Sequence, residues 1–172
     1  MTKLSLYLAT LLLGTNFSAS TTPPPPAPVA IVAPVRMSAV EQRFVDLANM
    51  ERRQRGLGTL SSNPLLVQVA REHSREMWVK NYFDHYSPTQ ELRTPMKRYL
   101  KSLGFTPTWA YLGENLFYCS IVDPDRGHQC FMQSPRHRDN IINEKFEQAG
   151  VGVFTSPDGQ FWVTELFLAQ ID

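Results

Sequence analysis

The sequence lacks the features that mark nucleic-acid-binding and transmembrane proteins. Seventeen Lys and Arg residues nearly balance sixteen Asp and Glu residues. No basic run and no interleaving of basic with aromatic residues occurs, which argues against a nucleic-acid partner. No apolar stretch reaches the roughly 20 residues that a membrane-spanning helix needs. Hydrophobic residues make up 42% of the 172 residues, enough for the core of one globular domain.

The first 20 residues have the pattern of a secretory signal peptide. Lys3 supplies a positive charge, Leu4–Leu13 is mostly apolar, and Ser18–Ser20 offers small residues for cleavage. We therefore expect the mature chain to be secreted or to lie in the cell envelope, with no transmembrane span once the signal is removed. The alternative is an uncleaved N-terminal anchor.

Residues 21–37 form a Pro-rich linker, in which Pro23–Pro26, Pro28 and Pro34 alternate with Ala and Val. Such a composition favours a semi-rigid polyproline spacer that holds a domain away from a surface. The alternative is a tail without regular structure. The globular domain is predicted to occupy residues 38–172.

Cysteine is scarce, since Cys119 and Cys130 are the only two. An even number of cysteines in an exported chain favours a disulfide, and these two lie 11 residues apart. The alternative is a pair of thiolate metal ligands, but the usual CxxC spacing is missing. We expect a Cys119–Cys130 bridge.

Local signals predict helices first and a β-hairpin last. Ser38 and Glu41 form a capping box, and Asn63-Pro64, Thr94-Pro95 and Ser134-Pro135 each place a capping residue before Pro at the first helical position. The predicted helices end near Gly56, Lys80 and Gly104, a short helix covers 126–133, and one more follows Ser134; extended segments cover 111–118, 149–155 and 161–168. This order favours an α+β fold with an antiparallel sheet.

Three side chains stand out as candidates for chemistry: His85, Glu114 and His137. His137 lies in the first turn of the last predicted helix, where an imidazole tends to stay neutral. Two neutral imidazoles and a carboxylate can hold a divalent ion and leave a water position open, or can form an acid–base pair. They lie 29 and 23 residues apart, so no short motif such as HExxH links them, and the spacing equally allows three unrelated residues.

A series of motifs resembles, in order, those of the CAP superfamily, which unites cysteine-rich secretory, antigen 5 and pathogenesis-related proteins. The motifs are Asn49-Met50-Glu51-Arg52, Asn63-Pro64-Leu65-Leu66, Ala70-Arg71-Glu72-His73-Ser74, Phe83-Asp84-His85-Tyr86-Ser87-Pro88, Gly113-Glu114-Asn115-Leu116, Ser134-Pro135-Arg136-His137-Arg138-Asp139-Asn140 and Gly150-Val151-Gly152-Val153. The resemblance covers about residues 40–168. It implies a three-layer α-β-α sandwich with a small antiparallel sheet.

The resemblance also implies a cleft formed by His85, Glu114 and His137, in which the two histidines bind Zn²⁺ or another divalent cation. The surrounding polar residues of this cleft are expected to be Ser87, Asn115, Asn140 and Glu165. The chain departs from the family pattern near Ser134, where some relatives have a second acid, and at Phe131 and Arg136. Glu165 on the last predicted strand is a candidate to compensate for the missing acid.

The function implied by the resemblance is that of a secreted binding module whose partner is a small lipid, a peptide or an envelope component. Two alternatives stay open: a metal-dependent peptidase or esterase in which Glu114 activates water, and a structural envelope protein with a vestigial cleft. We expect binding rather than catalysis, because no nucleophile–base pair or oxyanion element stands out.

Overall fold

The structure is a computed structural model that describes residues 35–171, so the predicted signal peptide and most of the predicted linker lie outside the described residues. Its elements are α1 (Ala39–Gln54), β1 (Ser61–Ser62), α2 (Pro64–Val79), the 3-10 helix η1 (Gln90–Leu92), α3 (Pro95–Leu103), β2 (Trp109–Cys119), α4 (Pro124–Gln133), α5 (Pro135–Ile141), β3 (Gln148–Thr155) and β4 (Phe161–Ile171). Within residues 35–171, no helix is both long enough and apolar enough to cross a membrane.

Helix starts follow the local signals in the sequence, with one exception. Ser38 accepts a hydrogen bond from the Glu41 amide and its own amide donates to the Glu41 carboxylate, which confirms the capping box. Asn63 and Thr94 cap α2 and α3 through their side chains. Ser134 makes no side-chain capping bond to α5, so its predicted role as a hydrogen-bonding cap is wrong. Pro135 alone favours the start of that helix.

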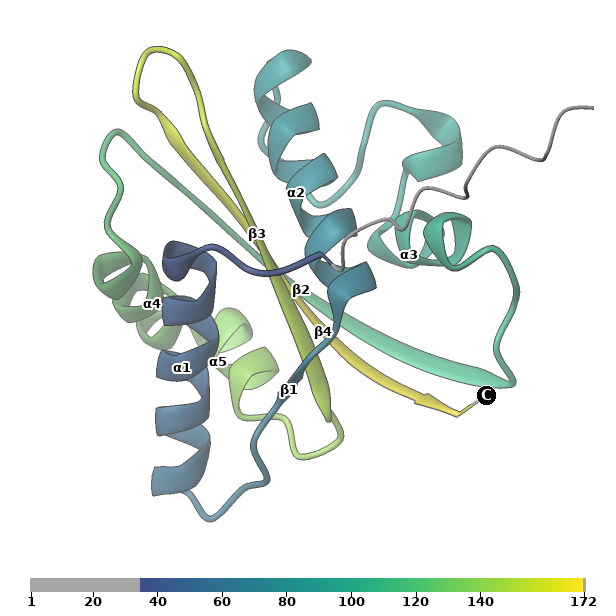
Figure 1. Ribbon diagram of the computed structural model, residues 1–172, viewed down its shortest axis with the longest axis vertical. Coiled ribbons are helices and arrows are strands. Elements are labelled where there is room, and N and C mark those ends of the chain that lie inside the picture. Colours follow the sequence, from purple (N-terminus) through teal and green to yellow (C-terminus); the bar gives the residue numbers. More distant parts are fainter. Residues whose placement is uncertain (1–34, 172) are drawn as a thin grey trace, which may run out of the picture. The chain divides into compact units, whose positions relative to one another are not determined.

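The sheet has the strand order β1-β3-β4-β2 and separates two helical layers. Strands β3, β4 and β2 are antiparallel neighbours as predicted, whereas the two-residue β1 pairs parallel with β3 and makes the sheet mixed. Helices α1, α4 and α5 lie on one side of the sheet, and α2 and α3 lie on the other (Figure 1). The predicted α+β sandwich of three layers is confirmed.

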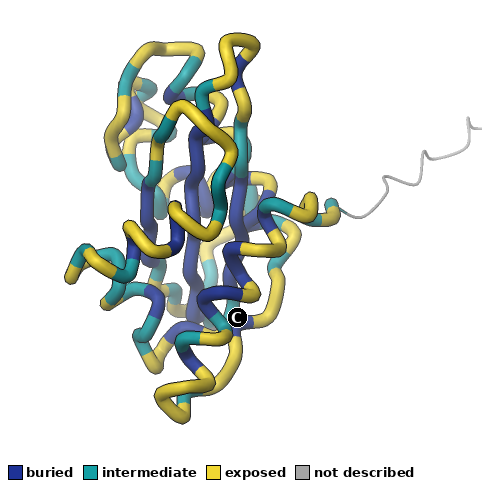
Figure 2. The backbone as a smooth tube through the Cα atoms, turned by 90° about the vertical axis from the view of Figure 1, so that its left-hand side faces the viewer, coloured by how far each residue is buried: buried dark blue, intermediate teal, exposed yellow. Residues whose placement is uncertain are grey.

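Strand β4 carries the centre of both hydrophobic cores. Phe161, Val163 and Phe167 contact the core under α1, α4 and α5, while Leu166 and Leu168 contact the core under α2 and α3. This alternation follows from the two-residue period of a strand. The sheet runs through the middle of the domain as a buried layer (Figure 2).

Helix α2 packs directly onto the backbone of β3 at two glycines. A Cβ atom on Gly152 would lie 2.0 Å from the Arg71 amide nitrogen, and one on Gly150 would lie 2.4 Å from the Leu66 Cβ. The space at Gly152 is closed by helix backbone, which has no rotamer to change. These two positions therefore set how closely α2 approaches the sheet.

The cysteine prediction is not met by the structure. Cys119 and Cys130 are both free cysteines. Cys119 ends β2 and its thiol donates to the Ile121 carbonyl at 2.8 Å, while Cys130 lies exposed on α4. The Cys119 thiol is therefore hydrogen-bonded within a local turn and Cys130 faces solvent, so the expected disulfide is not formed.

The contact at Gly152 gives a first testable prediction. Gly152→Ala should lower the free energy of unfolding by about 3 kcal/mol or more, the upper end of overpacking costs, because backbone cannot move aside. Gly58→Ala is the matched control, since a Cβ there meets nothing within 4 Å. Denaturant unfolding of both variants measures the difference. Equal effects of the two substitutions would contradict the packing argument.

Candidate functional site

Glu114 is the centre of a buried polar cluster at the edge of the sheet. It lies in β2, an edge strand, and its side chain is 2% exposed. One carboxylate oxygen accepts a bond from Nδ1 of His85 at 2.8 Å, and the other accepts from Nη2 of Arg98 at 2.5 Å. Both oxygens are therefore occupied by side chains from the layer that contains α3.

The bond to Glu114 fixes which nitrogen His85 presents to solvent. A carboxylate paired with a guanidinium accepts hydrogen bonds, so Nδ1 of His85 donates and Nε2 keeps its lone pair in the neutral ring. Arg98 also donates from Nη1 to the His85 carbonyl at 3.1 Å. The side chain of His85 remains 45% exposed, so its ring is fixed by Glu114 on the buried side and is open to solvent on the other.

Asn140 and Asn115 tie the same strand to α5 on the opposite side of the sheet. Asn140 donates to the Glu114 carbonyl at 3.2 Å and to Oδ1 of Asn115 at 2.8 Å. Asn115 in turn donates to the His137 carbonyl at 3.1 Å. A Cβ atom on Gly113 would lie 2.8 Å from Cζ of Phe146 and 2.9 Å from the Asn140 side-chain oxygen, so these side chains pack directly against the strand backbone at this glycine.

His137 approaches the cluster from α5. Its ring packs against Phe131 in a T-shaped contact with centroids 5.3 Å apart. Burial lowers the pKa of His137, and the nearby His85 lowers it further. The predicted neutral imidazole is therefore supported, with burial as the main cause. His85 comes from the loop after α2 and His137 from α5, so the two side chains belong to opposite helical layers.

Glu165 lies behind this cluster rather than at its surface. It stands opposite Asn115 in the β2–β4 register, is 1% exposed, and accepts a bond from Nδ2 of Asn115 at 3.0 Å. Its other oxygen is buried and has no hydrogen-bond partner within the described residues. Burial raises the pKa of Glu165 to about 8, against the opposing effect of the Asn115 bond. Glu165 is thus a buried acid that positions the side chain of Asn115.

Ser87 and His73 belong to a neighbouring network instead. Ser87 donates to the Glu76 carboxylate at 2.9 Å, and within residues 35–171 its side chain makes no hydrogen bond to His85 or Glu114. His73 is fully buried on α2, between the Tyr82 hydroxyl and the Asp84 carbonyl. Burial lowers the pKa of His73 to about 4, so it is a neutral core residue at physiological pH.

Two arginines that matter to the site carry no obvious signal in the sequence. Arg98 was not expected there, although a buried carboxylate such as Glu114 requires a cation or donors. Arg52 is 1% exposed and donates to the carbonyls of Ile141, Asn143 and Phe146 at 2.7–3.0 Å. These bonds hold the end of α5 and the loop after it, and hence the helix that carries His137.

The donor set suits a metal site with few protein ligands. No group of three or more His, Cys, Asp and Glu side chains within residues 35–171 is arranged to hold a metal ion. The two imidazoles, one oriented by a carboxylate and one with a lowered pKa, are the forms that bind divalent ions. His85 and His137 are thus the residues of this cluster whose chemistry could hold a divalent ion.

Comparison with known proteins identifies the family and the fold of the chain. The profile of the family described as "CAP: Cysteine-rich secretory protein family" matches residues 45–167. The chain belongs to the CAP family. The resemblance inferred from the motifs around His85, Glu114 and His137 is thereby confirmed, as is the sandwich fold that it implied.

Relatives of this CAP domain occur in several bacteria. The uncharacterized protein YkwD of Bacillus subtilis is 38% identical over 138 residues, which cover 80% of this chain and 50% of YkwD. An extracellular protein with an SCP domain from Bacillus anthracis has a solved structure with a TM-score of 0.65 and 32% identity, covering 76% of this chain and 40% of that one. An outer surface protein of Borrelia burgdorferi shares the fold at a TM-score of 0.62 and 19% identity, covering 75% and 91%. The chain thus spans half or less of the two Bacillus relatives.

The buried acid of this CAP domain gives a pH prediction. Folded Glu165 keeps its proton up to about pH 8, whereas an unfolded glutamate loses it near pH 4.5. The folded state therefore binds the extra proton between these values, and this contribution to stability is lost as pH rises, by at most about 1.4 kcal/mol per pH unit. Glu165→Gln should flatten that slope in urea unfolding across the range, while the exposed control Glu144→Gln should not. An unchanged slope for Glu165→Gln would show that Glu165 titrates normally.

Proposed function

We propose that the chain is an extracytoplasmic binding module in which His85 and His137 hold a divalent cation, Zn²⁺ or a similar ion, beside a site for a peptide or lipid ligand. The observation that carries the proposal is the hydrogen bond from Nδ1 of His85 to Glu114. Metal-binding histidines commonly donate their second ring N–H to a carboxylate, which fixes the ring and raises its basicity. The bound ion would supply a positive charge that attracts an oxygen of the ligand.

The same bond favours binding over hydrolysis. A general base must reach the water that it activates, and the Glu114 side chain is 2% exposed with each of its oxygens already accepting a bond, from His85 or from Arg98. Glu165, the other acid near the cluster, is buried and has a raised pKa, so it is no better placed to act on a solvent molecule. Glu114 therefore serves to orient His85.

Exposed aromatic rings beside His85 support an organic ligand. Phe83 precedes His85 by two residues and is 50% exposed, and Tyr118 in β2 is 42% exposed. These rings and Trp162 form a cluster with centroids 4.3–6.2 Å apart. Aromatic side chains at a protein surface provide contact area for apolar parts of a ligand. A location outside the cytoplasm agrees with the predicted signal peptide and with the Bacillus anthracis relative, which is an extracellular protein.

Metal analysis tests the two-histidine site. Purified protein equilibrated with Zn²⁺ should retain about one ion per chain, and His85→Ala/His137→Ala should retain none, because the site has only these two protein ligands. His128→Gln removes an imidazole from α4, away from the cluster, and should leave the metal content unchanged. Equal metal content in the double variant and the wild type would refute the site and favour a vestigial cluster.

The role of Glu114 has its own test. Glu114→Gln should weaken Zn²⁺ binding by about 10–100-fold without abolishing it, since the ring of His85 loses its orienting carboxylate. Circular dichroism checks that the variant folds despite the altered partner of Arg98. A peptidase or esterase predicts instead that wild-type protein turns over a panel of peptides and esters and that Glu114→Gln does not. Such turnover would overturn the binding proposal.

A further inference from the structure

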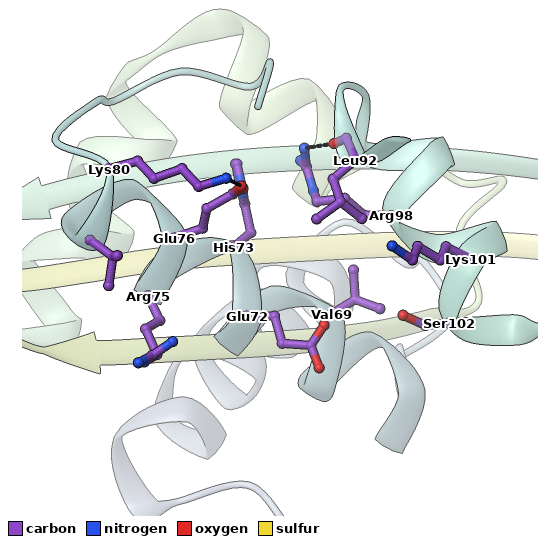
Figure 3. A pocket seen from close by; sticks show the side chains of 11 residues that line it. Val69, Glu72, His73, Arg75, Glu76, Lys80, Leu92, Arg98, Lys101 and Ser102 are labelled. Carbon is purple, nitrogen blue, oxygen red and sulfur yellow. Dashed lines mark hydrogen bonds and ion pairs between the residues drawn. The ribbon is translucent and has the colours of Figure 1, made fainter. Parts of the chain in front are cut away.

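A cavity of about 450 Å³ lies between α2 and α3, apart from the two histidines of the polar cluster (Figure 3). Its apolar lining comes from Val69, Val79 and Leu92. This size falls within the range of small-ligand sites. At about 30 Å³ for each water-sized group, it corresponds to roughly fifteen non-hydrogen atoms. A ligand as large as a dipeptide fits this space.

Half of the charged side chains that line the cavity are already paired within the protein. Lys80 is paired with Glu76 at 2.7 Å, and Arg98 is paired with Glu114 at 2.5 Å. Burial raises the pKa of Glu76, but hydrogen bonds from Lys80 and other donors outweigh it and bring the pKa to about 2, so this pair stays ionic. His73 is neutral at physiological pH. These groups leave no net charge for a ligand to balance.

Three charged side chains that line the cavity remain without an ion-pair partner in the described part of the chain: Glu72 and Arg75 on α2, and Lys101 on α3. Arg75 is exposed and extends away from the other two (Figure 3). Glu72 and Lys101 point into the same space from facing helices, with Ser102 beside Lys101 (Figure 3). Glu72 accepts only an exposed bond from Gln68, Lys101 has no hydrogen-bond or ion-pair partner within residues 35–171, and the two form no ion pair with each other.

The buried side chain of Arg98, which is 4% exposed, forms part of the cavity wall. Its Nε atom has no accessible surface and is therefore not a contact point for a ligand in the cavity. The cavity thus offers a carboxylate, an ammonium group with a hydroxyl beside it, and an apolar wall.

We propose that this cavity binds a short peptide with apolar side chains and two free ends, of the size of a dipeptide. The α-amino group would pair with Glu72, the α-carboxylate with Lys101 and the Ser102 hydroxyl, and the side chains would contact Val69, Val79 and Leu92. A simple anion or a fatty acid could pair with Lys101 but would leave the Glu72 carboxylate without a partner. The site goes beyond the proposed metal function, since neither His85 nor His137 lines it.

Calorimetric titration with Leu-Leu and its two capped forms tests the proposal. N-acetyl-Leu-Leu lacks the amine charge and Leu-Leu-amide lacks the carboxylate charge, so each should bind at least about tenfold more weakly than Leu-Leu. Glu72→Gln should remove the preference for Leu-Leu over the acetylated form. Lys101→Met should remove the preference for Leu-Leu over the amide. Both side chains are exposed, so neither substitution should impair folding.

The control variants make the same charge changes at positions that do not line the cavity. Glu91→Gln on η1 and Lys97→Met on α3 alter exposed residues that do not line it, and both should bind Leu-Leu as the wild type does. Absence of Leu-Leu binding to the wild type, or equal binding of the three peptides, would overturn the proposal. The His85→Ala/His137→Ala variant should still bind Leu-Leu, so failure of the metal site and failure of this site give different results.

Discussion

The polar cluster depends on Glu114, which is bound from both helical layers. Its carboxylate accepts bonds from His85 and Arg98 in the layer of α3, and its backbone carbonyl accepts a bond from Asn140 in α5. An edge strand has carbonyl groups on its outer side without a strand neighbour, and Asn140 supplies the missing donor. A buried carboxylate and guanidinium are tolerated because each is hydrogen-bonded, and removing one leaves the other uncompensated. Glu114 therefore links the loop that carries His85 to α5, the helix that carries His137.

The order and bounds of the helices could be predicted because their signals are local. The capping box at Ser38 and the cap-then-Pro pairs at Asn63 and Thr94 act within one helical turn, so the sequence alone places those starts. The two-residue β1 and its parallel pairing with β3 have no such signal, since they depend on a neighbour 86 residues away, as in the Ser61–Glu147 bond. The contact of α2 with Gly152 is equally long-range and equally invisible in local patterns.

Part of the polar cluster followed the predicted residues: His85 is hydrogen-bonded to Glu114, and Asn115 and Asn140 link the same strand to α5. The sequence could not show that Arg98 binds one oxygen of Glu114, because burial of the carboxylate creates that requirement. Glu165 had a signal that was missed. It falls in the inward series of β4 with Phe161, Val163 and Phe167, so the two-residue period already placed it in the core rather than at a surface.

Buried side chains set the orientation of the His85 ring, although His85 itself lies in a loop and is half exposed. Nη1 of Arg98 donates to the backbone carbonyl of His85, and Nη2 donates to the Glu114 carboxylate, which holds the His85 ring. Because a guanidinium is planar and rigid, these two contacts cannot shift independently. Arg98 also lines the cavity between α2 and α3, so the cluster and the cavity share one buried wall. The loop around His85 is thus held by a side chain from α3, and the sheet edge needs no second acid to keep its histidine in place.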